Sequence, residues 1–478
     1  DLEQAAREGF RSIEHVKRYT TNGMATDQGK TSNLNALAIV ADALGKTMPE
    51  VGMTTFRMPV TPVSFGALAG MARGAQFEPV RTTPLHDGAV SRGAVFEDAG
   101  QWKRARYFPL TFADGTRETM AAAVARECRI TRAAVGMLDA STLGKIEIAG
   151  PDAAEFIARL YANHWPRLSP GQCRYGLMLK DDGTIFDDGI VAMLAPNRFH
   201  VTTTTGGAGR VLHHMEDYRQ TEWPQLRVWL TSVTEQWATI AVQGPQAREA
   251  LRPLVEGIDV SSLAMPHMSL REGTICGAAM RLFRISFTGE LGFEVNVPAG
   301  SASTIWEAIA AQVAANSGTW YGTEAMHVLR AEKGYILVGQ ETDGTVTADD
   351  ARLGAMVAHS KPDFVGKRGA RRQNLMAKGR KQLVGLLTAD AQVILQEGAQ
   401  LMESGDLPSP AHAIGHVTSA YWSATLGRSM ALGLVEDGRN RHGRQIHATF
   451  LSGSGTGTHA VTIADPVFYD PQGARLRV

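Results

Sequence analysis

Apolar positions gather in a stretch before the middle of the chain. Residues 175–179 alternate as a β-strand does, residues 181–183 (Asp-Asp-Gly) have strong turn chemistry, and Ile185 begins a second apolar run. This pattern predicts a β-hairpin. Its return strand carries two adjacent carboxylates, Asp187 and Asp188. Because successive strand side chains point to opposite faces, we expect only one of the two to face inward.

The inward-facing carboxylate of this pair is a candidate for a functional site. Burying a carboxylate costs free energy unless the group is paired or hydrogen-bonded. The alternative is a hairpin end with two solvated acids, which the local sequence alone favours. A second carboxylate, Glu294, lies in another apolar strand pattern close to Gly289 and Gly292. Taken alone, Glu294 is also more typical of an exposed strand position.

The pattern along the rest of the chain divides it into four regions. Prolines interrupt the second region, and a long irregular segment of this kind usually wraps another domain or subunit. Helix and strand patterns alternate in the third region, and short strands separated by Gly, Asp and Ser turns follow in the fourth. The predicted regions are a helical N-terminal unit (1–60), an irregular wrapping segment (61–120), an α+β domain (121–375) and a small β-barrel (376–478).

The N-terminal unit contains two amphipathic patterns, residues 2–16 and 32–44, which predict helices. Ser32 or Asn33 would cap the second helix, and Gly45 would end it. The loop between the helices is dense in hydrogen-bond donors and leads directly into a helix N-terminus, which suits a phosphate. A polar turn between two helices explains the same residues equally well.

The third region contains an internal repeat. Residues 146–156 have the pattern of an alternating strand, then Gly-Pro, then a helix start, and residues 240–250 repeat this pattern 94 residues later. We therefore expect a duplicated α+β unit. Two such halves facing each other would leave a groove between them, which is a common place for a ligand.

Composition limits the range of functions. Lys plus Arg equals Asp plus Glu at 48 each, so no net field points to nucleic acid or an anionic membrane as a partner. The three cysteines are far apart, which favours neither a disulfide framework nor a metal site and indicates a reducing compartment. With no apolar run of membrane-spanning length and a charged N-terminus unlike a signal peptide, we expect a cytoplasmic protein. Dinucleotide and phosphate-loop fingerprints are also missing, so another chain or segment would hold most of any dinucleotide.

Several spaced motifs agree with one family. They are Gly150-Pro-Asp-Ala, the Tyr175 to Asp188 hairpin, Thr288-Gly-Glu-Leu-Gly-Phe-Glu, Leu329-Arg-Ala-Glu-Lys-Gly, Phe364-Val-Gly-Lys and Gly415-His-Val-Thr-Ser. Together they resemble the aminomethyltransferase (glycine-cleavage T-protein) family of folate-binding proteins. The resemblance implies an α+β class, with a duplicated folate-binding domain followed by a small C-terminal β-barrel.

Within that family the sequence resembles the α subunits of heterotetrameric sarcosine oxidases. The stretches that begin at Arg18 (Arg-Tyr-Thr-Thr-Asn-Gly-Met), Phe96 (Phe-Glu-Asp-Ala-Gly-Gln-Trp) and Val338 (Val-Gly-Gln-Glu-Thr-Asp-Gly) carry this likeness. Such subunits begin with a further N-terminal half that contains a dinucleotide-binding domain. We therefore expect this chain to be the C-terminal part of such a subunit, either a fragment or the downstream product of a split subunit.

The resemblance also implies residue roles. Asp188 would be the acid that faces the ligand and lies close to the one-carbon transfer, as the catalytic residue. Tyr175, Phe287, Glu294 and Arg330 would complete the folate site with it. Phe287 stands where relatives usually have Tyr, so the stacking face is kept but the hydroxyl is lost. A further departure, an alanine at position 355 where relatives often carry Trp, weakens the expected contacts to the folate tail.

By the same resemblance, the N-terminal unit would lie near an FMN at the contact between two subunits. The candidate FMN and interface residues are Arg18, Gln28, Lys30, Thr31 and Ser32. In related subunits this loop carries cysteines for an iron–sulfur cluster. It has no cysteine here, so we expect neither a cluster nor another metal.

The implied function is the capture of a one-carbon unit by tetrahydrofolate in an oxidase of sarcosine or another N-methyl amine. The implied partners are a flavin-containing β subunit, smaller subunits and the dinucleotide-binding half of the α subunit. FMN would be shared with a partner, and FAD and NAD would lie elsewhere in the complex. The alternatives are a stand-alone tetrahydrofolate-dependent aminomethyl- or methyltransferase and a scaffold subunit whose folate site has decayed.

Overall fold

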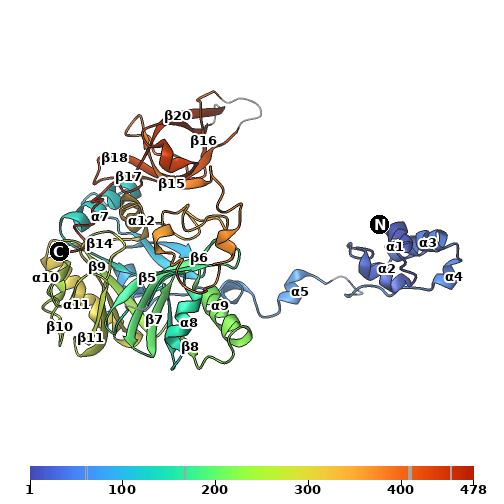
Figure 1. The fold of residues 1–478 in the computed structure, drawn as a ribbon, viewed down its shortest axis with the longest axis horizontal. Helices are drawn as coiled ribbons and strands as arrows, with labels where there is room; N and C mark the ends of the chain where they lie inside the picture. The colour runs from blue at the N-terminus through green and yellow to red at the C-terminus, as the bar shows by residue number, and fades with distance from the viewer. Residues whose placement is uncertain (60, 62, 166–167, 407–411, 453–454) are drawn as a thin grey trace. The chain divides into compact units, whose positions relative to one another are not determined.

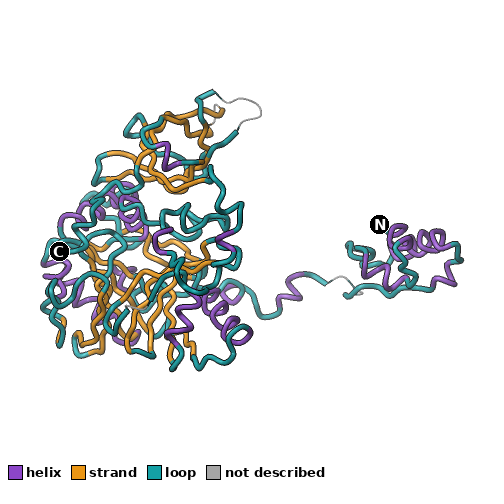
Figure 2. The backbone as a smooth tube through the Cα atoms, viewed as in Figure 1, coloured by secondary structure: helices purple, strands orange, loops and turns teal. Residues whose placement is uncertain are grey.

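A computed structural model describes residues 1–59, 61, 63–165, 168–406, 412–452 and 455–478 (Figure 1). The chain forms two compact units, Asp1–Pro79 and Val80–Val478. Figure 2 shows that the first unit is helical, whereas the second combines helices and strands. No helix in the described part of the chain is long and apolar enough to cross a membrane.

The first unit is a small helical bundle with its own apolar core. Its helices are α1 (Leu2–Arg7), α2 (Ile13–Tyr19), α3 (Ser32–Leu44) and α4 (Met48–Val51). α5 (Phe65–Ala69) follows in the same unit and has no buried residue. The prediction of α3 is confirmed, but the single helix predicted over residues 2–16 is wrong. The chain bends after α1, because Ala5, Val16 and Val40 then share one core, which a continuous rod could not close.

The second unit contains two sheets built on the same plan. One sheet has the order β5-β6-β7-β4-β8, and the other contains β11-β12-β13-β9-β3 with β10 and β14 at its edges. The strands of the first are β4 (Gly144–Ala149), β5 (Cys173–Leu179), β6 (Ile185–Ala195), β7 (Arg198–Thr203) and β8 (Trp229–Ser232). Those of the second are β3 (Gly136–Asp139), β9 (Trp237–Gln243), β10 (Val255–Glu256), β11 (Ser269–Ile275), β12 (Ala278–Arg284), β13 (Gly292–Pro298) and β14 (Thr319–Trp320).

The two halves exchange one strand. β3 precedes β4 in the chain but pairs with β9, whereas β8 precedes β9 but pairs with β4. Each half therefore completes the sheet of the other. This exchange fits the duplication that the repeated Gly-Pro pattern predicts, and it ties the two halves into one domain.

Helices cover the outer faces of both sheets and fill the space between them. The helices of the second unit are α6 (His86–Ser91), α7 (Met120–Ala133), α8 (Ala153–Leu160), α9 (Ala208–Thr221), α10 (Ala247–Leu251), α11 (Ala302–Ala315) and α12 (Thr323–Glu332). α8 and α9 pack on the five-stranded sheet, and α10 and α11 pack on the seven-stranded sheet. α7 and α12 share a third core with the opposite faces of both sheets and with the barrel.

Part of the segment predicted to be irregular, residues 61–120, is regular. Val95–Ala99 (β1) and Trp102–Tyr107 (β2) form an antiparallel hairpin, and α5 and α6 lie in the same stretch. The hairpin was missed because the cationic side chains of β2 interrupt any simple apolar alternation. Arg106 on this hairpin pairs with Glu324 of α12, so the hairpin belongs to the second unit.

The C-terminal region is a closed six-stranded barrel, as predicted. Its order is β15-β18-β17-β16-β19-β20. The strands are β15 (Lys381–Thr388), β16 (Gln400–Met402), β17 (Gly415–Ser423), β18 (Arg428–Glu436), β19 (Gln445–Ser452) and β20 (Gly455–Ala464). Closure leaves no open sheet edge, and an apolar interior that includes Val384, Leu401 and Ile463 fills the barrel.

Candidate functional site between the two sheets

The predicted hairpin is formed by β5 and β6, and it brings Tyr175 and Asp188 together. Tyr175 pairs with Ile190 and Leu177 pairs with Asp188, so the tyrosine and the acid are diagonal neighbours on one face. The Tyr175 hydroxyl donates to Asp188 Oδ2 at 2.5 Å. Burial raises the pKa of Asp188 to about 7, the hydrogen bond from Tyr175 opposes this rise, and the negative charge of Asp187 adds to it.

Asp187 is also buried, so the prediction that only one carboxylate of the pair faces inward is wrong. It is 1% exposed and lies on the face that packs under α9. Its carboxylate accepts from the backbone N–H of Asp188 at 2.8 Å and from the hydroxyl of Thr204 at 3.1 Å. Both faces of β6 are covered, because this strand lies inside a layered domain. Asp187 therefore holds the loop before α9.

Glu294 lies on β13, at the centre of the seven-stranded sheet. It is opposite Phe283 on one neighbouring strand and Ala241 on the other. The residue is 9% exposed, and within the described part of the chain its carboxylate makes no hydrogen bond. Burial raises the pKa of Glu294 to about 7, and the positive charge of Lys145 opposes the rise. A buried carboxylate without a partner is costly for the fold, so it is a strong candidate for ligand binding.

The two predicted acids face the same space. Leu177, the cross-strand partner of Asp188, and Ala241, the partner of Glu294, belong to one apolar cluster with residues of α12. Side chains of directly paired residues lie on the same face of a sheet. Asp188 and Glu294 therefore point into the layer between the two sheets. Phe287 packs on the same cluster and stacks on Tyr335, with ring centroids 6.1 Å apart.

Lys145 is a buried charge that the sequence interpretation missed. It is 0% exposed, and its ammonium donates to the carbonyl oxygens of Ser141 at 2.8 Å and Leu143 at 3.1 Å. Burial lowers the pKa of Lys145 to about 8, while the negative charges of Asp139 and Glu294 oppose this shift. A lysine inside the apolar strand pattern of residues 145–148 was the available signal.

Arg330 lies under the barrel in a network of its own. Its Nη1 donates to Glu341 Oε2 at 2.7 Å, and its Nη2 donates to Ser419 Oγ at 2.7 Å. Both charged side chains are fully buried. The guanidinium thus joins α12 to the barrel, although its buried Nε has no protein partner in the described part of the chain. Its folate contact stays a prediction.

The predicted FMN residues lie in the first unit around the start of α3. Arg18 and Lys30 are exposed. The backbone N–H groups of Thr31 and Ser32 both donate to Asp27 Oδ2, at 3.1 and 2.8 Å. Asp27 therefore occupies the anion site that the sequence indicated at this helix N-terminus, and Thr31, not Ser32 or Asn33, is the N-cap residue. The amide of Gln28 donates to the carbonyl of residue 25.

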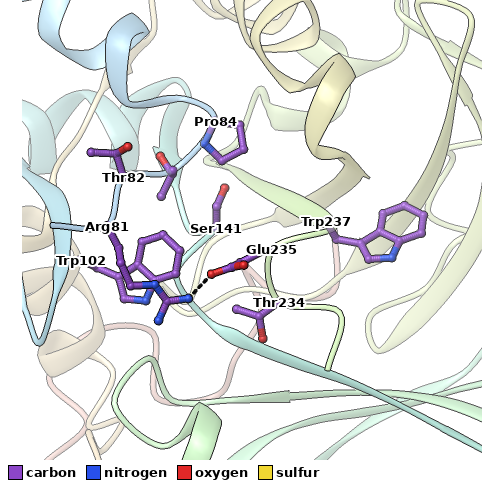
Figure 3. A pocket seen from close by; sticks show the side chains of 9 residues that line it. Arg81, Thr82, Pro84, Trp102, Ser141, Thr234, Glu235 and Trp237 are labelled. Atoms are coloured by element: carbon purple, nitrogen blue, oxygen red, sulfur yellow. Dashed lines mark hydrogen bonds and ion pairs between the residues drawn. The ribbon is translucent and has the colours of Figure 1, made fainter. Parts of the chain in front are cut away.

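A pocket of about 370 Å³ opens beside the β1–β2 hairpin (Figure 3). Its wall includes Trp102, and the Arg81 guanidinium lies 4.0 Å above that ring while pairing with Glu235. The pocket is lined by Arg81, Thr82, Thr83, Pro84, Trp102, Ser141, Thr234, Glu235 and Trp237. Thr83 also donates to Asp139 Oδ2 at 2.5 Å, so the pocket reaches the buried charges around Lys145.

Three family models match the chain. The GCVT N-terminal domain matches residues 85–361, the sarcosine oxidase A3 domain matches residues 1–71, and the glycine cleavage T-protein C-terminal barrel domain matches residues 381–470. Sarcosine oxidase subunit alpha of Corynebacterium sp. (strain P-1) is 48% identical over 99% of this chain and 48% of that protein. The chain therefore spans about half the length of this curated relative.

Aminomethyltransferases also match most of the chain. The aminomethyltransferase of Desulforamulus reducens is 30% identical over 75% of this chain and 90% of that protein. The crystal structure of the glycine cleavage system aminomethyltransferase T from Bartonella henselae superposes with a TM-score of 0.70 at 24% identity, covering 82% of this chain and 99% of that chain. The predicted family is confirmed: the chain belongs to the GCVT aminomethyltransferase family and has sarcosine oxidase alpha subunits among its homologues.

Proposed function

We propose that this chain carries the folate-dependent half of a sarcosine oxidase and transfers the one-carbon unit from amine oxidation to tetrahydrofolate. The observation that carries the proposal is Glu294, a buried carboxylate without a hydrogen bond in the described part of the chain. It faces the same layer as the Tyr175–Asp188 pair. In a member of the GCVT family, these residues would form the natural ligand site.

The donors of a reduced pterin suit this arrangement. The pterin ring presents a ring N–H and an amino group side by side, and a carboxylate can accept from both. Glu294 would hold the ring in this way, and Phe287 would offer it an apolar face. Ligand donors would also remove the cost of burying Glu294 without a partner. Arg330 would act from below the site through its buried Nε.

Asp188 would act on the reacting atoms. Oxidation of an N-methyl amine gives an iminium cation, and a preorganised carboxylate stabilises such a cation in a site that excludes water. The folate nitrogen that attacks the iminium carbon loses a proton, and the amine that departs gains one. With a pKa near 7, Asp188 can accept the first proton and supply the second. Tyr175 would hold the carboxylate in place.

The amine would be oxidised on another chain. Relatives named sarcosine oxidase subunit alpha are about twice as long as this chain, so we infer a complex that contains further domains and subunits. A flavin-bearing β subunit would produce the iminium, with FMN shared at the contact and FAD and NAD bound elsewhere. The exposed side chains of Arg18 and Lys30 would be available for the FMN contact, in a cytoplasmic complex without nucleic acid or membrane partners.

The test is an anaerobic titration of the full chain with tetrahydrofolate, in which calorimetry measures the binding. We expect binding by the wild type and a loss of affinity of at least tenfold in Glu294→Gln and Asp188→Asn, because each removes a charged acceptor. Asp181→Asn is the matched control, since Asp181 is an exposed acid in the turn of the same hairpin. This control should bind tetrahydrofolate as the wild type does.

A second measurement separates transfer from oxidation. In the assembled complex, Asp188→Ala should release more free formaldehyde and form less 5,10-methylenetetrahydrofolate, while amine oxidation at the partner's flavin continues. An unchanged yield of methylenetetrahydrofolate in this variant would refute the role of Asp188. Absence of tetrahydrofolate binding by the wild type would instead favour a scaffold subunit with a decayed site. Purification without a yellow partner chain would favour a stand-alone transferase.

A further inference from the structure

Arg104 is a partly buried cation on the β1–β2 hairpin. It lies two residues from Trp102 on β2, and these two side chains share one face of the hairpin. Its Nε is buried without a hydrogen-bond partner in the described part of the chain. Among the same residues, no carboxylate lies within ion-pair distance of the guanidinium. Because a buried donor without a hydrogen-bond partner is costly for the fold, this residue is a candidate for ligand binding.

The acids around Arg104 already have other partners. Its cross-strand neighbour Glu97 accepts from the Thr323 hydroxyl at 2.5 Å. Glu324 accepts from Arg106 at 2.7 Å. Asp139 accepts from a threonine hydroxyl and from a backbone N–H. Each local carboxylate is therefore satisfied without Arg104, and the guanidinium fork stays available for an anion.

Arg104 also lies on the strand that contributes to the pocket wall. Trp102, two residues along the same strand, forms part of the pocket wall that Figure 3 shows. Glu294 pairs with Ala241 and Ala241 pairs with Leu138 across three neighbouring strands, and Asp139 follows Leu138 at the end of β3. The Asp139 carboxylate accepts from the hydroxyl of Thr83, which lines the same pocket as Trp102. A ligand anchored at Glu294 that follows these strands toward the pocket would reach β2, which carries Arg104.

We propose that Arg104 binds a carboxylate of the molecule held at Glu294, and specifically the glutamate carboxylate at the tail of a folate. This proposal rests on the proposed function. A planar guanidinium fork matches a carboxylate with two parallel hydrogen bonds, and shielding from water strengthens them. Burial, followed by the positive charges of Arg330 and Arg104, lowers the pKa of His327 on α12 to about 3. The imidazole is thus neutral, and Arg104 provides the charge.

The experiment compares two probes on the full chain. Tetrahydrofolate has the glutamate tail, whereas 6-methyltetrahydropterin has the same reduced ring without it. We expect Arg104→Gln to weaken the binding of tetrahydrofolate about tenfold to a hundredfold, as for a lost charged hydrogen bond. The binding of 6-methyltetrahydropterin should be unchanged. The affinity of Arg104→Lys for tetrahydrofolate should lie between those of the wild type and of Arg104→Gln, because an ammonium keeps the charge but not the fork. Glycine is titrated in parallel as an amino acid carboxylate.

Lys103→Gln provides the matched control. Lys103 lies on the other face of the same strand and pairs with Asp98 at 2.5 Å, so its removal changes the net charge equally. This control should leave both affinities unchanged. A loss confined to glycine would overturn the assignment to the folate tail. Equal losses for both pterins, or no loss for any probe, would overturn the proposal as well. Failure of the wild type to bind either pterin would overturn the proposed function itself.

Discussion

At the level of single residues, the site depends on two carboxylates whose pKa values are both close to 7. The cause is the same, because burial penalises the ionised form of each acid. The compensation differs. Asp188 receives a hydrogen bond from Tyr175, whereas Glu294 has only the longer-range attraction of Lys145 among the described residues. Asp188 is thus held in place by the protein, and Glu294 is left to a ligand.

Removing the Tyr175 hydroxyl should change the pH dependence of one-carbon transfer. The hydrogen bond from Tyr175 lowers the pKa of Asp188, so Tyr175→Phe should raise it above its value of about 7. Under the proposed function, formation of methylenetetrahydrofolate needs the ionised acid, so it should then decline at a higher pH as the solution is acidified. The rate–pH profile of the assembled complex measures this shift. An unchanged profile would exclude Asp188 as the titrating group.

Glu294→Gln should stabilise the chain at alkaline pH. The carboxyl group has a pKa of 4.5 when unfolded and about 7 when folded, so the folded state binds more protons between these values. The free energy of unfolding therefore falls as pH rises through this window, and it stays lower above pH 7. The variant lacks this loss. Between pH 4.5 and pH 8, its free energy of unfolding relative to that of the wild type should rise by about 2–3 kcal/mol, as measured by urea denaturation.

An exposed acid provides the reference for that comparison. Glu222→Gln removes a carboxyl group that lies at the surface after α9. The difference in free energy of unfolding between this variant and the wild type should be the same at both ends of the pH window. If Glu294→Gln follows Glu222→Gln at both ends of the window, Glu294 is solvated or paired in solution.

At the level of elements, each half of the domain turns from strand to helix at one glycine. Gly150 follows β4 with a φ of +136°, and Gly244 follows β9 with a φ of +134°. A Cβ atom would lie 2.2 Å from the carbonyl oxygen of Arg227 at the first position and 2.5 Å from that of Ala134 at the second. The conformation and the close backbone contact both require glycine.

Alanine at either glycine should destabilise the chain by a similar amount. We expect Gly150→Ala and Gly244→Ala each to lower the free energy of unfolding by at least about 1–3 kcal/mol, because backbone carbonyls cannot move aside easily. Gly209→Ala is the control, since a Cβ atom added to this helical glycine of α9 would meet no described atom within 4 Å. It should be neutral or slightly stabilising. A large loss at only one of the two glycines would contradict the equivalence of the halves.

Local patterns were enough to predict the repeat, the barrel and the Tyr175–Asp188 hairpin, because alternation and turn chemistry operate within a few residues. They could not predict that β3 and β8 exchange sheets, since that pairing depends on the packing of the two halves. The β1–β2 hairpin was not predicted, for a related reason. Arg106 pairs with Glu324 of α12 at a position where a pattern-based prediction expects an apolar residue.

The same limit applies to the functional residues. Family resemblance indicated Glu294 as a ligand-binding acid, and its burial supports that choice. Resemblance did not indicate that Arg330 is tied to the barrel through Glu341 and Ser419. Nor did any pattern reveal the unpaired charge of Arg104. Such partnerships join residues that are distant in sequence, so only the folded chain brings them to light.

At the level of the whole molecule, α12 joins the barrel to the duplicated domain. Arg330 pairs with Glu341, and the Ser423 hydroxyl of β17 donates to Glu332 at 2.6 Å. The Arg330–Glu341 pair is fully buried, so removal of one partner leaves an uncompensated charge, which typically costs about 3–5 kcal/mol. The first unit has a separate apolar core and does not depend on this pair.

Glu341→Ala should therefore affect one of two thermal transitions. Because residues 1–79 and 80–478 have separate cores, calorimetry of the full chain should resolve a small and a large transition. The variant should shift the large transition down by several degrees and leave the small one in place, which serves as an internal reference. Glu403→Ala, which removes the partner of Arg441 at the barrel surface, should shift neither, since exposed ion pairs contribute little. If Glu341→Ala split the large transition instead, the barrel would unfold independently, and the buried pair would hold the barrel in place without making it part of one cooperative unit.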